Sequence, residues 1–130
     1  MSHRINISSG AIWEDKVGYS RAVKIGNHIE VSGTVASDEK GKLIGLDDAY
    51  QQTKYILEKI EKALVQAGAS LKDVVRTRMF VTDISRFDEY ARAHGEAFSS
   101  IKPCRAMIEV KGLVSAEYLI EIEATAILST

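Results

Sequence analysis

Alternating hydrophobic and polar residues mark several short stretches of the chain, the pattern of strands with one buried face. In the segment 28–35 (HIEVSGTV), Ile29 and Val31 alternate with Glu30 and Ser32. The preceding segment, 19–25, leads into it through a Gly-Asn pair that favours the tight turn of a β-hairpin. Six strands are therefore predicted, the other four at residues 3–7, 74–82, 104–110 and 119–128.

Two segments show the three-and-four spacing of amphipathic helices. The first begins at Asp47 or Asp48 and runs to about Gln66, and Gly68 suits the left-handed residue that ends a helix. The second is expected to begin after Ser85, which can act as its N-terminal cap. The predicted buried stripes are Ala49, Thr53, Ile56, Ile60, Ala63, Leu64 and Ala67 in the first helix, and Phe87, Tyr90, Ala91, His94 and Phe98 in the second.

The order of the predicted elements limits the architecture. Strands joined through a helix imply parallel pairing, whereas hairpins at both ends of the chain imply antiparallel pairing. The simplest solution is an α+β fold, a mixed β-sheet with two helices packed on one face. The 130 residues suit one domain, 1–130, because this is a common size for a domain with a single core.

Composition and charge exclude several classes of protein. The chain is 45% hydrophobic and 27% charged, as in ordinary globular proteins, and its net charge of -1 disfavours nucleic acid as a partner. The single cysteine, Cys104, excludes an internal disulfide and a multi-cysteine zinc site. No apolar run has the length of a membrane span, and the first residues do not resemble a signal peptide. We therefore expect a cytoplasmic protein with no membrane partner.

The sheet face away from the helices is predicted to mix charged and apolar side chains. On the last strand this face takes Glu121, and we expect Arg105 and Met107 of the preceding strand to lie on the same face. Two interpretations remain open. The face is either a solvated surface with weak ion pairs, or a subunit interface with a cleft lined by paired charges. The central strand is expected to add Arg76, Arg78 and Phe80 to this face.

Motifs of known catalytic sites are missing from the sequence, which contains no nucleophile elbow, P-loop, HExxH or dinucleotide fingerprint. Cys104 is in phase with Ala106 and Ile108, so we expect it to be buried and unreactive. The remaining candidates are Arg105 and Glu121, on neighbouring predicted strands. Such a pair can hold a small anion and orient a water, and it can equally be a structural ion pair.

Three segments together resemble the Rid family, also called the YjgF or L-PSP family. The run PCRAMIEVKGLVSAEYLIEIEA (103–124) resembles the family's C-terminal signature, and GYSRAVKIGNHIEVSGTVA (18–36) resembles its N-terminal hairpin. The run ASLKDVVRTRMFVTDISRFDEY (69–90) resembles the strand that leads into the second helix. The resemblance covers most of the chain. It implies a chorismate-mutase-like fold and a homotrimer with clefts between its subunits.

The same resemblance implies a reaction and a set of site residues. Its archetypal activity is hydrolysis of 2-imino acids, as enamines or imines, to 2-oxo acids and ammonia, with no metal or organic cofactor. By position, Arg105 would bind the substrate carboxylate and Glu121 would hold and polarise the attacking water. The backbone carbonyl of Met107 would be the second ligand of that water, and Tyr19 and Ser32 would line the cleft.

Several positions depart from the archetypal deaminases and leave alternatives open. Met107 replaces a cysteine, Ala91 replaces an asparagine of the second helix, and Trp13 lies in a segment unlike the archetype. The alternatives are a deaminase of another catabolic pathway, a non-catalytic trimer that binds small carboxylates, and an endoribonuclease-like translation inhibitor. The near-neutral charge disfavours the last of these, because phosphate binding depends largely on Lys and Arg.

Overall fold

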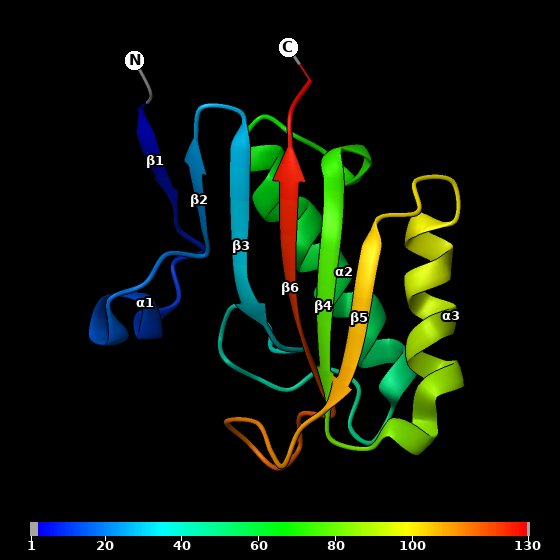
Figure 1. The fold of residues 1–130 in the computed structure, drawn as a ribbon. Coiled ribbons are helices and arrows are strands. Elements are labelled where there is room, and N and C mark those ends of the chain that lie inside the picture. The colour runs from blue at the N-terminus through cyan, green and yellow to red at the C-terminus, as the bar shows by residue number, and fades with distance from the viewer. Residues whose placement is uncertain (1–2, 130) are drawn as a thin grey trace.

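A six-stranded sheet forms the centre of the computed structural model, which describes residues 3–129 (Figure 1). Its strand order is β1-β2-β3-β6-β4-β5. Only β4 and β5 pair in parallel, and the other neighbours pair antiparallel. The predicted mixed sheet is confirmed. The strands are β1 (Arg4–Ile7), β2 (Ala22–Ile25), β3 (His28–Thr34), β4 (Val74–Val81), β5 (Cys104–Glu109) and β6 (Ile120–Ile127).

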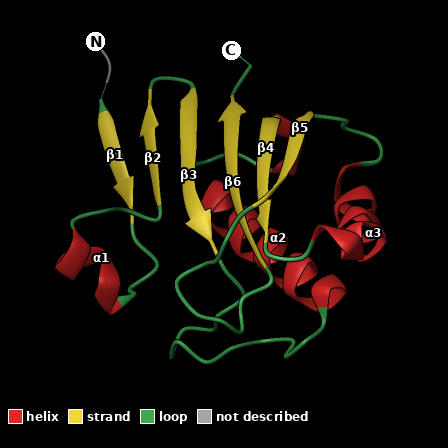
Figure 2. Ribbon diagram, turned by 60° about the horizontal axis from the view of Figure 1, so that its bottom comes forward, coloured by secondary structure: helices red, strands yellow, loops and turns green. Residues whose placement is uncertain are grey.

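Two helices, α2 (Ala49–Gln66) and α3 (Phe87–Phe98), pack on one face of this sheet, as predicted (Figure 2). Asp48 caps α2 by accepting a hydrogen bond from the Gln51 N–H, and Gly68 adopts the expected left-handed conformation with φ of 83°. The predicted buried stripe of α2 is confirmed at every position. Within residues 3–129, no helix is both long and apolar enough to cross a bilayer.

The hydrophobic core lies between these helices and the central strands. Residues of β6 alternate between the core and the opposite, open face, so that Ile120, Ile122, Ala124 and Ala126 are buried. Tyr90 and other large side chains complete the core from the helices. Because burying one large aliphatic side chain contributes roughly 1.5–3 kcal/mol, this packing supplies most of the force that holds α2 and α3 on the sheet.

A short helix, α1 (Ile12–Val17), lies between β1 and β2 and was not predicted. It is held by Glu14, whose buried carboxylate accepts hydrogen bonds from Ser8 and Ser9, and it ends at Gly18 with φ of 88°. A helix of six residues is too short to show a clear period in the sequence. Its apolar residues are also exposed rather than aligned on a buried stripe: Ile12, Trp13 and Val17.

The start of α3 differs from the prediction. The side chain of Asp83, and not that of Ser85, is the local cap: it accepts a hydrogen bond from the Ser85 N–H at the start of a 3-10 turn, Ile84–Arg86, that leads into the helix. Phe87 was expected on the buried stripe but is 42% exposed, because it stands at the first position of the helix, beyond the core.

The predicted hairpin of the last two strands is wrong. β6 does not pair with β5 but lies between β3 and β4, and β5 is an edge strand that pairs only with β4. The connection 110–119 runs along one end of the sheet and carries the chain past β4 (Figure 1). This long loop removes the constraint that makes consecutive strands neighbours in a tight hairpin.

The predicted face of β5 is also wrong. Partners in the parallel pairing share a face, and Arg105 pairs with Thr77, which is buried beneath α3. Glu121 pairs with Phe80 on the opposite, open face of the sheet. Arg105 and Glu121 of one chain therefore lie on opposite faces. Cys104, expected to be buried, is exposed, because it pairs with Arg76 and so lies on the open face of the sheet.

A buried glutamine links α2 to two loops and provides a test of the fold. Gln52 donates from Nε2 to the carbonyls of Gly45 and Glu117, both at 3.0 Å, and its Oε1 accepts from the Leu119 N–H at 2.8 Å. We expect Gln52→Leu to lower the free energy of unfolding by about 2–3 kcal/mol, because three backbone groups lose their partner.

Urea denaturation at one fixed protein concentration measures this change. The matched control is Gln51→Leu, because Gln51 is the exposed neighbour in the same helix. We expect the control to stay within about 0.5 kcal/mol of the unsubstituted chain. Equal stabilities for the two variants would contradict the structural role of Gln52.

Candidate active site

An irregularity in β3 positions the first group of predicted site residues. The pairing of β3 with β6 shifts between Val31 and Thr34, which is the signature of a β-bulge at Ser32 and Gly33. The Ser32 N–H donates to the Arg21 carbonyl at 3.0 Å, and the Ser32 hydroxyl donates to the Ser20 carbonyl at 2.6 Å. Ser32 is thereby fixed against the segment that follows Tyr19.

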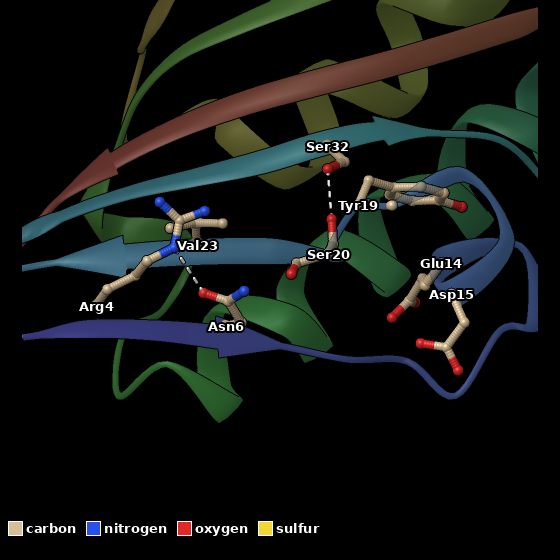
Figure 3. A pocket seen from close by; sticks show the side chains of 9 residues that line it. Arg4, Asn6, Glu14, Asp15, Tyr19, Ser20, Val23 and Ser32 are labelled. Carbon is tan, nitrogen blue, oxygen red and sulfur yellow. Dashed lines mark hydrogen bonds between the residues drawn. The ribbon is translucent and has the colours of Figure 1, made fainter.

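Tyr19 and Ser32 line the same pocket, which has a volume of about 550 Å³ (Figure 3). The pocket opens beside α1 and the first two strands, and most of its wall is polar. The structure thus brings these two predicted site residues together, and their part in a reaction stays a prediction. The lining residues are Arg4, Asn6, Glu14, Asp15, Gly18, Tyr19, Ser20, Val23 and Ser32.

Glu14 is a fixed anion in the wall of this pocket. Its carboxylate accepts hydrogen bonds from the Ser8 hydroxyl at 2.8 Å, the Ser9 N–H at 3.0 Å and the Ser9 hydroxyl at 2.5 Å. Burial is the largest influence on its pKa and raises it, but the hydrogen bonds from Ser9 and Ser8 outweigh burial and the pKa is lowered. Glu14 therefore stays charged and serves to anchor α1.

Glu121 lies on the open face, directly against Gly33 of the bulge. A Cβ atom added to Gly33 would stand 1.9 Å from Oε2 of Glu121, so the carboxylate occupies the space that any other residue would fill. Burial raises the pKa of Glu121, the neighbouring Glu123 raises it further, and Arg21 opposes both. A carboxylate with a raised pKa is better matched to proton transfer near neutral pH.

Arg21 was not singled out from the sequence, yet it belongs to this group. Its guanidinium is buried, with only 9% of the residue exposed, and Nη2 donates to the Gly33 carbonyl at 2.7 Å. Its Nε is buried and has no hydrogen-bond partner within the described part of the chain. The strand period carries a signal for it, because Arg21 follows Tyr19 by two residues and shares its phase.

The second group of predicted site residues lies at the other edge of the sheet. Arg105 projects from the helix side of β5, with its guanidinium 5.7 Å from the centre of the Phe87 ring. Met107 is on the same side and packs against the core. Among residues 3–129, no carboxylate forms an ion pair with Arg105. Its positive charge is therefore available to a ligand or to another chain.

Beneath Arg105, His94 is neutral and structural. Its Nε2 is 2.9 Å from the Thr77 hydroxyl, and its ring packs on Phe98 at 4.7 Å between centroids. Burial lowers the pKa of His94 to about 4, and the charge of Arg105 contributes in the same direction. His94 therefore serves as a satisfied core residue, as its place on the predicted apolar stripe suggests.

Comparisons with known proteins agree with this fold. Residues 13–128 match the family model described as endoribonuclease L-PSP. The structure of Rv2704 from Mycobacterium tuberculosis, a member of the YjgF/YER057c/UK114 family, is 48% identical and superposes with a TM-score of 0.88, covering 97% of this chain and 100% of that one.

Two further relatives carry more specific names. The 3-aminoacrylate deaminase RutC of Acinetobacter baylyi is 36% identical over 108 residues, which are 83% of this chain and 85% of that protein. The structure of RidA from an Antarctic Psychrobacter species is 31% identical with a TM-score of 0.78, covering 85% of this chain and 88% of that one. Both similarities extend over most of each chain.

The lowered pKa of His94 predicts how stability depends on pH. Between the unfolded pKa of 6.5 and the folded pKa of about 4, the unfolded chain binds a proton at this side chain and the folded chain does not. His94 therefore contributes up to about 3 kcal/mol to the free energy of unfolding above pH 6.5, and this contribution is lost as the pH falls towards 4.

The free energy of unfolding of the unsubstituted protein and of the His94→Gln variant is measured at a series of pH values. The difference between them separates the titration of His94 from that of the carboxylates. Glutamine can keep a hydrogen bond to Thr77 but does not titrate. We expect the difference in stability between the two proteins to shrink as the pH falls from 6.5 to 4. A difference independent of pH would contradict the assignment.

Proposed function

This chain belongs to the endoribonuclease L-PSP family, also called the YjgF or Rid family, and on that premise we propose that it is a hydrolytic deaminase of small 2-imino acids. Its products would be 2-oxo acids and ammonia. The observation that carries the proposal is the set of unpaired charges: among residues 3–129, neither Arg105 nor Glu121 has an ion-pair partner. A relative named as a deaminase of an enamine acid supports the reaction class.

In the proposed site, Arg105 binds the carboxylate of the substrate. A planar guanidinium can form two parallel hydrogen bonds to a carboxylate, which fixes its orientation as well as its charge. Tyr19 and Ser32 line the cleft that receives the rest of the molecule, in keeping with the pocket they share. The attacking water is held by Glu121 and by the backbone carbonyl of Met107.

The proposed reaction needs only water and a group that moves a proton. The water oxygen adds to the imine carbon while Glu121 accepts one proton from the water. That proton passes to the nitrogen, which gives a carbinolamine. The new hydroxyl group then loses its proton as the C=O bond forms, the nitrogen gains that proton, and the C–N bond breaks with its electron pair leaving on ammonia. A C=O bond remains in the 2-oxo acid. Positioning supplies much of the acceleration, because the imine is already electrophilic.

The proposed enzyme is a homotrimer with its sites between subunits. Arg105 and Glu121 of one chain lie on opposite faces of the sheet, so they can meet only across a contact between two copies. One subunit would then contribute Arg105 and Met107, and its neighbour would contribute Glu121. Exposed apolar side chains on strands of the sheet support a buried contact; they include Ile5, Ile25, Ile108 and Ile127.

The alternative reactions receive less support from these residues. A deaminase of another catabolic pathway would use the same machinery, and a panel of imines and enamines would distinguish it. A non-catalytic trimer would bind 2-oxo acids saturably without turnover. An endoribonuclease would need a surface that neutralises phosphates, and the chain has 17 basic against 18 acidic residues.

Ammonia release from an imine generated in situ by an amino-acid oxidase tests the proposal. We expect Arg105→Ala to lower kcat/KM by at least about 100-fold through loss of the bidentate contact, and Glu121→Gln to lower kcat by about 100-fold or more. The matched control is Arg76→Ala, an arginine of β4 outside the proposed site. Turnover no faster than buffer, or an Arg105→Ala protein with unchanged rate, would refute the proposal.

Mixing the two inactive variants tests whether the sites lie between subunits. When Arg105→Ala and Glu121→Gln chains are unfolded, combined in equal amounts and refolded, roughly a quarter of the intersubunit sites should contain both original residues. We expect activity to return to about that fraction. If each site is built within one chain, the mixture will stay as inactive as its components.

A further inference from the structure

The buried guanidinium of Arg21 stands among charged groups from several elements. Burying a charge is costly unless nearby groups compensate for it. Only one of its hydrogen bonds is made within the described part of the chain, to the Gly33 carbonyl at 2.7 Å. The charges that act on Arg21 or feel its field are Glu14 of α1, Glu121 of β6 and Lys59 of α2, together with the phenol of Tyr19.

Two of these groups have partners of their own. Glu14 is already held by the hydrogen bonds from Ser8 and Ser9. The ammonium group of Lys59 donates to the Val35 and Ser37 carbonyls at 2.8 and 2.9 Å. Glu121 has no hydrogen bond or ion pair among residues 3–129. By elimination, Glu121 is the anion that most needs the charge of Arg21.

Gly33 connects the two residues physically. Its carbonyl is bound by Arg21, and the space beside its Cα is filled by the Glu121 carboxylate. Gly33 lies in the β-bulge, where the ladder between β3 and β6 is interrupted and the backbone is less constrained. The bond from Arg21 therefore fixes the piece of backbone on which the Glu121 carboxylate rests.

We propose that Arg21 is a positioning residue for Glu121: it holds the backbone of Gly33, against which the carboxylate lies, and it brings a buried positive charge to that carboxylate. This role rests on the proposed function, in which Glu121 must be deprotonated to accept a proton from water. Neither the sequence motifs nor the resemblance assigned Arg21 any part in the site.

The surroundings of Glu121 show why such a charge is needed. Burial and Glu123 both raise the pKa of Glu121, and Arg21 is the group that lowers it. Arg78 of β4 lies 3.9 Å from Glu123 and is engaged there. Phe80, the β4 partner of Glu121, is uncharged. Without Arg21, the water-activating carboxylate would hold its proton to a higher pH.

The first test measures the electrostatic coupling between Arg21 and Glu121, that is, the response of Arg21 to the titration of Glu121. It needs no substitution that removes Arg21. The ¹⁵N–¹H resonance of Arg21 Nε, in a buried position, and the ¹³C carboxyl resonance of Glu121 are followed by NMR through a pH titration. The Glu121→Gln variant assigns the carboxyl signal. We expect the Arg21 Nε resonance to shift with the same midpoint as Glu121. An Arg21 resonance that does not move through that midpoint overturns the proposal.

The second test separates charge from geometry. In Arg21→Gln we expect the titration midpoint of Glu121 to rise by about half a pH unit or more, because a nearby positive charge is lost. In Arg21→Lys, which keeps the positive charge, most of this rise in the Glu121 midpoint should be absent. Arg76→Gln, on β4, is the matched control and should leave it unchanged. An unchanged midpoint in a folded Arg21→Gln protein contradicts the role.

Gly33→Ala tests the contact between Gly33 and the Glu121 carboxylate, because the new methyl group competes with the carboxylate for the same space. We expect a crystal structure of this variant to show the carboxylate displaced while the strands stay in place. Gly112→Ala is the control, since no atom lies within 4 Å of its added Cβ. If the carboxylate keeps its position in Gly33→Ala, Gly33 does not determine where the Glu121 carboxylate lies.

These measurements do not depend on turnover, so they separate two kinds of failure. If the coupling is present but no imine is hydrolysed, the proposed function fails and the link between Arg21 and Glu121 stands. If imines are hydrolysed but the coupling is absent, only the role of Arg21 fails. Where both hold, the acid limb of the pH profile of kcat should move upward in Arg21→Gln by the same amount as the Glu121 midpoint.

Discussion

Strand β6 pairs with β3 on one side and with β4 on the other, and this double pairing determines how the whole sheet is arranged. The core-facing residues of β6 pack against α2, so the residues between them point to the open face. That phase sets Glu121 beside Gly33 of β3 and opposite Phe80 of β4. A shift of one residue in this register would bury two glutamates and expose the core.

The strongly periodic elements could be predicted from the sequence. Every position expected on the buried stripe of α2 is buried, and the alternation of β6 matches its core and open faces. Both elements have one face against the core, and burial imposes a clear period on their residues. The hairpin at Gly26 was predictable for a local reason, because a tight turn there requires a residue that tolerates positive φ.

The predictions that were wrong concern which face of the sheet a strand residue takes and which strands are neighbours, because the local sequence pattern determines neither. In β5, the order CRAMIE places apolar residues in both phases, so its period does not say which face Arg105 takes. The neighbour of a strand is set by packing at a distance, and a long loop before β6 allows it to enter the sheet beside β3. For the site, resemblance led to Tyr19 and Ser32, which share a pocket. It could not reveal Arg21, whose part depends on a contact with Gly33.

The correction to β5 strengthens the case for a site between subunits. Had Arg105 and Glu121 shared a face, they could have neutralised each other as an ordinary ion pair, and nothing would require a second chain. Their separation leaves a cation at one edge of the sheet and a carboxylate on the open face. In the proposed enzyme, the buried charge of Arg21 supports this carboxylate, and Arg105 binds the charge of the substrate. In the proposed trimer, this separation would keep the two charges from neutralising each other within one chain, and assembly would bring them to the same site.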